Sequence, residues 1–132
     1  MMNLNQNETI PLSNQQIATV VRDAKKLLEE QGRCRHDMVN ESGQYCMLGA
    51  LATALGVDIS GYKMWPLDST NNLWGANSFR QVRYALSDFI VYNGYGVGIA
   101  SLNDHEDTTD KMVICVLEQF ADFMEEPCTP QN

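Results

Sequence analysis

The stretch Cys46-Met47-Leu48-Gly49-Ala50-Leu51-Ala52-Thr53-Ala54-Leu55 decides the fold of this chain. Its apolar residues cover every side of a helix, and Gly56 follows as a stop signal. A helix that is apolar all round has to lie in the middle of a domain. Gly49 and Ala50 would let a neighbouring helix approach closely, because they carry almost no side chain. The sequence therefore predicts a buried central helix.

Three further segments have the spacing of amphipathic helices, with apolar residues recurring every three or four positions. Capping boxes at residues 13–16 and 78–81 begin two of them, and Gly32 ends the first. Thr108 or Thr109 caps the third, which ends at Pro127. The predicted buried faces consist of Ile17, Val20, Val21, Ala24, Leu27 and Leu28; of Phe79, Val82, Leu86, Phe89 and Ile90; and of Met112, Val113, Val116, Leu117, Phe120 and Phe123.

The segments between these helices carry weaker signals. Residues 34–44 contain the turn sequence Asn40-Glu41-Ser42-Gly43, which fits a short hairpin or an extended arm. Residues 57–77 show no clear period, although a short helix or strand is expected there. Residues 93–98 read as a loop or tight turn. The fold class is therefore mainly α: a single-domain bundle of about four helices with a small β-hairpin or extended arm.

Length and composition are those of one small globular domain. The chain has 132 residues, of which 44% are hydrophobic, which suffices for a core. We expect a polar leader at 1–12, one globular domain at 13–127 and a tail at 128–132. Neither a bilayer-spanning stretch nor the start of a signal peptide is recognisable, so we expect a cytoplasmic protein of a bacterial host cell.

Negative charge is concentrated in the second half of the chain. The formal net charge is −8, and residues 67–132 alone hold ten acidic and three basic residues. Such a field repels nucleic acid and anionic membranes, so neither is an expected partner. It attracts a basic protein surface, although acidity also serves simple solubility. The residues expected to meet such a partner are Asp104, Glu106, Asp107, Asp110, Glu118, Asp122, Glu125, Glu126, Trp65 and Trp74.

Two of these predictions carry explicit alternatives. Glu118, Asp122 and Glu125 share one face of the last helix, where each like-charged pair costs about 0.2–0.5 kcal/mol. That cost suggests a use in binding, unless basic side chains from other elements neutralise the face. Trp65 and Trp74 are either exposed anchors for a partner or caps over the core.

Cys46 is the candidate for covalent chemistry, because it begins the central helix and a helix N-terminus lowers the pKa of a thiol. A cysteine nucleophile also needs a base, for which the chain offers His36 or His105, with Asn103 or Asp104 to orient it. The alternative is a buried cysteine that packs as a small apolar side chain. This constellation would make the protein a cysteine-dependent hydrolase or transferase.

No cofactor and no metal site are expected. The four cysteines lack the paired spacing of a zinc site. The glycines at 94, 96 and 98 are not followed by a helix start, which a phosphate-binding loop requires. A calcium loop starting at Asn103 would need Gly and Glu where Thr108 and Ile114 stand. The acids at 103–107 are better explained as a cap before the last helix.

Several short motifs resemble a family of small uncharacterised proteins from actinobacteria and their phages. The motifs are a Cys-x-x-Gly-Ala-Leu helix at residues 46–51 and Asn103-Asp104 before a Thr-capped helix. The similarity spans roughly residues 15–125. The family has no assigned activity and no shared histidine, so the resemblance implies a phage or mobile-element origin and argues against a Cys-His enzyme.

Together these features favour a non-enzymatic acidic binding protein that is encoded by a phage or mobile element. It would inhibit a basic host protein such as a nucleic-acid-binding defence enzyme, with carboxylates imitating backbone phosphates as in DNA mimics. The alternatives are the cysteine enzyme and an immunity protein against a basic toxin. The sequence leaves the oligomeric state open, and a dimer is possible.

Overall fold

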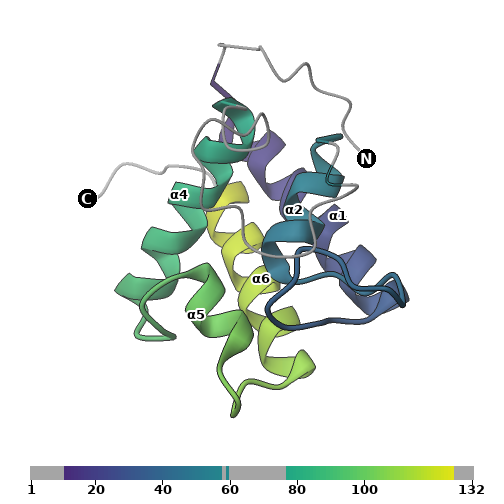
Figure 1. The fold of residues 1–132 in the computed structure, drawn as a ribbon. Coiled ribbons are helices and arrows are strands. Elements are labelled where there is room, and N and C mark those ends of the chain that lie inside the picture. The colour runs from purple at the N-terminus through teal and green to yellow at the C-terminus, as the bar shows by residue number, and fades with distance from the viewer. Residues whose placement is uncertain (1–10, 58, 60–76, 127–132) are drawn as a thin grey trace, which may run out of the picture.

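The computed structural model describes residues 11–57, 59 and 77–126 and is mainly helical (Figure 1). No β-sheet occurs within these residues, which confirms the predicted helical bundle. The described helices, labelled as in Figure 1, are α1 (Asn14–Gln31), α2 (Met47–Ala54), α4 (Asn77–Tyr92), α5 (Ile99–Asp104) and α6 (Asp110–Glu125). Some segments named in the sequence analysis lie outside the described residues. Trp65 and Trp74 do so entirely, and the expected leader, the expected tail and the segment after α2 do so at least in part.

α1 begins and ends where the sequence predicts. The Ser13 hydroxyl accepts a hydrogen bond from the Gln16 N–H (3.1 Å), and the Gln16 side chain accepts one from the Ser13 N–H (2.8 Å). Gly32, with φ of 92°, ends the helix and donates its N–H to the Leu28 carbonyl. Its apolar face packs against α6 and α2, so α1 forms one wall of the bundle.

α2 is the buried centre, as its apolar sequence predicts. Every residue of the helix except Thr53 is buried, and α1, α4 and α5 all contact it. The close approach expected at Gly49 is made by the backbone of a loop rather than by a helix. A Cβ atom at position 49 would lie 1.9 Å from the carbonyl oxygen of Met38. Only glycine therefore allows the loop to lie against α2.

Residues 33–45, here called the arm, carry the loop that meets α2. The predicted turn is present, with the Gly43 N–H donating to the Asn40 carbonyl (3.0 Å). The segment is the extended arm of the prediction, because a single antiparallel bridge, from Val39 to Tyr45, closes the turn and an isolated bridge joins Tyr45 to Arg33. The backbone of the arm forms single hydrogen bonds with the chain segments on either side of it. In one of them, the Cys46 N–H donates to the Met38 carbonyl (3.2 Å).

The start of α4 differs from the prediction, whereas α6 begins at one of the two predicted caps. α4 begins at Asn77, so Ser78 lies buried inside the helix rather than at its cap. The Gln81 side chain does not close a capping box; it bonds both the N–H (2.8 Å) and the carbonyl (3.0 Å) of Leu12. α6 is capped by Thr109, while Thr108 is buried. A tertiary contact therefore engages the Gln81 side chain, which local sequence assigns to a capping box.

α5 was not predicted. It has only six residues, too few to show a helical period, and it ends with Asn103 and Asp104. The acids at 103–107 were expected to stand directly before the last helix, but only Asp110 lies in the first turn of α6. Two residues of the predicted α6 core are also exposed, Met112 (46%) and Phe123 (58%).

None of the helices in the described part of the chain is both long and apolar enough to cross a lipid bilayer.

We expect Gly49→Ala to lower the free energy of unfolding by about 2 kcal/mol or more, because the added methyl group forces the arm away from α2. Urea unfolding followed by circular dichroism measures the loss. Gly96→Ala is the matched control, since its new Cβ would meet Leu102 at an ordinary 3.6 Å. Equal stability of the two variants would contradict the close approach at Gly49.

Candidate functional site

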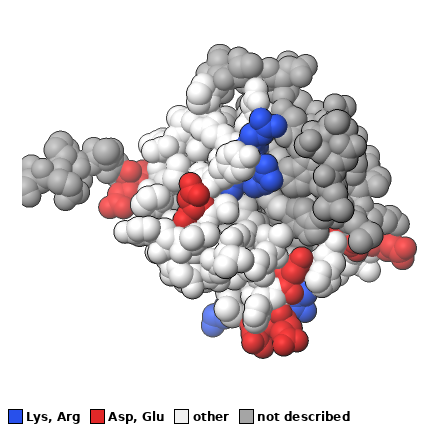
Figure 2. Space-filling view, turned by 60° about the vertical axis from the view of Figure 1, so that its left-hand side comes forward, with Lys and Arg blue, Asp and Glu red and all other residues white. Residues whose placement is uncertain are grey.

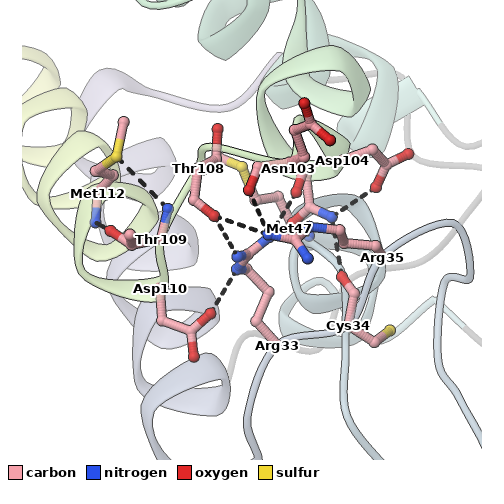
Figure 3. Close-up of polar contacts among 11 residues, drawn as sticks. Arg33, Cys34, Arg35, Met47, Asn103, Asp104, Thr108, Thr109, Asp110 and Met112 are labelled. Atoms are coloured by element: carbon pink, nitrogen blue, oxygen red, sulfur yellow. Dashed lines mark hydrogen bonds and ion pairs between the residues drawn. The ribbon is translucent and has the colours of Figure 1, made fainter.

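Several of the residues singled out from the sequence meet where the arm, the start of α2 and the end of α5 come together (Figure 3). Asn103 lies at the centre of this junction and is 0% exposed. Its side-chain oxygen accepts from the Met47 N–H (3.0 Å), the first N–H of α2. Its amide nitrogen donates to the Cys34 carbonyl (2.9 Å) and to Asp104 (2.9 Å). One amide thus ties three segments together.

Arg33 closes the same junction from the arm. Its guanidinium donates to the backbone carbonyls of Asn103 and Thr108 and to the carboxylate of Asp110 (2.8 Å), as Figure 3 shows. Its side chain is only 6% exposed. Arg35 adds a bond to the Thr108 carbonyl (3.0 Å). Sequence reasoning missed both arginines, because nothing in their local spacing shows which carbonyls they reach.

The two histidines bond to acidic residues and not to Cys46. The backbone N–H of His36 donates a hydrogen bond to the Asp104 carboxylate (3.1 Å), and Nδ1 of the His36 ring lies 3.5 Å from the same carboxylate. His36 has a φ of 72°, a conformation that this contact helps to hold. His105 accepts a hydrogen bond from the Asp107 N–H (3.1 Å) and is exposed.

Cys46 is part of the core. It is 0% exposed, and its sulfur caps α2 by accepting from the Gly49 N–H (3.3 Å). The expectation that the helix N-terminus lowers its pKa is wrong, because burial raises the pKa of Cys46 to about 12. A thiol of that kind stays protonated near neutral pH. Asn103 lies close to the start of α2, as the enzyme hypothesis requires, but its side-chain amide is hydrogen-bonded to the Met47 N–H and the Cys34 carbonyl. The geometry does not support the cysteine-enzyme interpretation.

The acidic row Glu118, Asp122 and Glu125 on α6 faces basic side chains of α1. Arg22 lies 2.7 Å from Asp122 and 3.0 Å from Glu125, while Lys25 lies 3.8 Å from Glu118. The row therefore binds α6 to α1, which is the neutralising alternative left open by the sequence. These pairs are exposed, so each contributes only about 0.2–1 kcal/mol.

The remaining acids are distributed over the turn after α5 and the two ends of α6. Asp110 pairs with Arg33, whereas Glu106 and Asp107 are exposed in the turn. Glu126 is the C-cap of α6. Within the described residues, no group of three or more metal-binding side chains is positioned to hold an ion.

A surface feature that the sequence did not predict lies between α4 and α6. An apolar groove of about 540 Å³ opens there. Phe89 forms its floor, with its ring centroid 5.2 Å from that of Phe120 and 5.4 Å from that of Phe123. Tyr92, 90% exposed, stands at its edge. Sequence periodicity placed Phe89 and Phe123 inside the bundle, and nothing local shows that α4 and α6 leave this space open.

Residues 12–123 match DUF6197, a family of unknown function. The chain belongs to this family. The DUF6197 match begins just before α1 and reaches Phe123 in α6, so it covers every described helix at least in large part. This confirms the resemblance to an uncharacterised family, whereas the motif details and the phage or actinobacterial origin stay predictions. No curated protein and no solved structure matches the chain.

We expect Asn103→Ala to lower the free energy of unfolding by about 2–4 kcal/mol, because the buried Met47 N–H and Cys34 carbonyl lose their partner. Urea unfolding measures the change. Asn93→Ala is the control: its amide bonds one exposed carbonyl, of Phe89, and the loss should stay below about 1 kcal/mol. An Asn103→Ala protein as stable as the wild type would contradict the central role of this amide.

We expect iodoacetamide to leave Cys34 and Cys46 unmodified in the native protein even at about pH 8.5, since burial raises the pKa of both thiols. Cys115 is exposed and should react, which makes it the internal control. Mass spectrometry of digested protein locates the label, and denatured protein shows that all sites can react. Labelling of native Cys46 at neutral pH would restore the enzyme hypothesis.

Proposed function

We propose that this protein is a non-enzymatic binding protein that docks a basic, amphipathic helix of a partner protein in the groove between α4 and α6. The observation that carries the proposal is the groove itself, which exposes Phe123 and Tyr92 over a floor of packed phenylalanine rings. Aromatic side chains dominate the binding energy of protein interfaces. An apolar groove beside a helix is a common receptor for the apolar face of a partner helix.

Charge around the groove supports a basic partner. Asp88 lines the groove on the α4 side, and α6, whose Phe123 and Met124 also line the groove, ends at the C-cap Glu126. The negative end of the α6 dipole adds to these carboxylates. Figure 2 views the side on which α4 lies and shows a broad uncharged area with an acidic side chain within it, more acidic side chains at its edges and basic side chains near the middle of the view. A helix with apolar anchors and flanking Lys or Arg residues complements such a surface.

The proposal keeps the basic partner inferred from the net charge of −8 but moves the main contact away from the acidic row. That row already pairs with Arg22 and Lys25, so reversing its charges would weaken the contact between α1 and α6 as well as any binding. Inhibition of a nucleic-acid-binding defence enzyme by a phage-encoded protein is the role we favour. Immunity against a basic toxin would use the same contact.

We expect Phe123→Ser to weaken partner binding at least about tenfold, because it removes an exposed ring at the centre of the groove. The wild-type protein and the variant are immobilised, bacterial lysate is passed over both, and cross-linked partners are identified by mass spectrometry. Val97→Ser is the matched control, since Val97 is exposed but does not line the groove. Circular dichroism verifies that both variants fold.

The proposal requires a basic protein that binds the wild type and Val97→Ser, is lost with Phe123→Ser, and dissociates as salt rises from about 0.05 M to about 0.5 M. The cross-links must map to a helix that carries Lys or Arg beside its apolar face. Retention by Phe123→Ser, or a captured partner without a basic helix, would overturn it.

A further inference from the structure

α4 has a second exposed surface, which adjoins the groove and shares Asp88 with it. Arg80, Tyr84, Asp88 and Val91 follow one another at spacings of four, four and three residues, so they share one face of the helix. All four are exposed, Tyr84 by 57% and Val91 by 54%. We call these four residues the outer face of α4. It combines two large apolar side chains with the opposite charges of Arg80 and Asp88, and the guanidinium of Arg83 lies against its Tyr84 ring.

The order of charges on the outer face makes it complementary to itself. Arg80 and Asp88 lie equally far from Tyr84, about 6 Å along the helix axis on either side. A two-fold axis through Tyr84 would bring a second copy of α4 alongside in the antiparallel direction. Each Arg80 would then face the partner's Asp88, and the two Tyr84 rings would meet at the axis. A parallel copy would instead place like charges together.

We infer that a second copy of this chain occupies the outer face of α4, so that the protein forms a two-fold symmetric, antiparallel dimer through that helix. Closed two-fold contacts bury the same patch on both subunits, which a patch complementary to itself allows. This inference does not rest on the proposed function, because Arg80, Tyr84 and Val91 do not line the groove and the oligomeric state is measured without a partner protein.

Two arginines of α4 make contacts within the chain that affect how the outer face can meet a second copy. The guanidinium carbon of Arg83 lies 5.0 Å from the centroid of the Tyr84 ring and restrains that ring by a cation–π contact. Arg80 has a contact of its own within the chain. A guanidinium carries five N–H donors, so Arg80 can still bind a carboxylate of the second copy.

Sedimentation velocity between about 5 µM and about 500 µM tests the dimer, because a contact along a single pair of helices is small and its dimer correspondingly weak. We expect the wild type to pass from monomer to dimer within this range. Asp88→Arg should raise the dissociation constant at least about tenfold, since it sets two arginines against each other. Adding Arg80→Asp in the same chain restores opposite charges and should recover the dimer.

Asp107→Arg is the matched control, because it makes the same change of charge at an exposed position in the turn after α5. It should leave the dimer unchanged. Tyr84→Glu provides an independent variant that should give a monomer, and circular dichroism verifies the fold of each protein. A wild type that stays monomeric throughout would overturn the inference. So would a dimer that survives Asp88→Arg and Tyr84→Glu, or a double variant that fails to recover while still folded.

Discussion

The structure depends on one buried amide. Asn103 has two polar atoms, and between them they satisfy the first N–H of α2, a carbonyl of the arm and the neighbouring Asp104. Without it, the start of the most apolar helix would leave a backbone donor unsatisfied in the core, where such a group is costly. Arg33 then fixes the backbone around Asn103 from the arm side. The arm stays ordered without a sheet because these side chains, and the space left by Gly49, hold it against α2.

The distribution of charge follows from this packing. Once α1 lies along α6, Arg22 and Lys25 meet the acidic row, so the charge that most resembled a binding stripe joins α1 to α6 at the surface. In the function that we propose, a partner would contact the mainly apolar surface on α4 and the end of α6. Its affinity would come from aromatic contacts, while the net negative charge would favour basic partners and speed their approach.

Local signals predicted the helices well where they act within a few residues. The capping box at Ser13, the stop at Gly32 and the apolar run of α2 all hold. Prediction failed where a side chain left its local partner for a distant one. The Gln81 side chain bonds to Leu12 instead of capping α4. Prediction also missed α5, which carries Asn103, because a helix of six residues is too short to show a period. The sequence singles out four residues of the junction, Asn103, Asp104, Cys46 and His36. It predicts catalytic or binding roles for them, because residue spacing does not reveal which side chains are buried.

The sequence by itself determined that the chain is a helical bundle around residues 47–54, because periodicity and capping are interactions between residues close in the chain. It also determined the net charge of −8. Only the tertiary structure decided that Cys46 is buried with a raised thiol pKa, that the acidic row is neutralised and that an aromatic groove remains open. Each of these depends on which elements lie side by side, and residues up to about a hundred positions apart decide that through packing and desolvation.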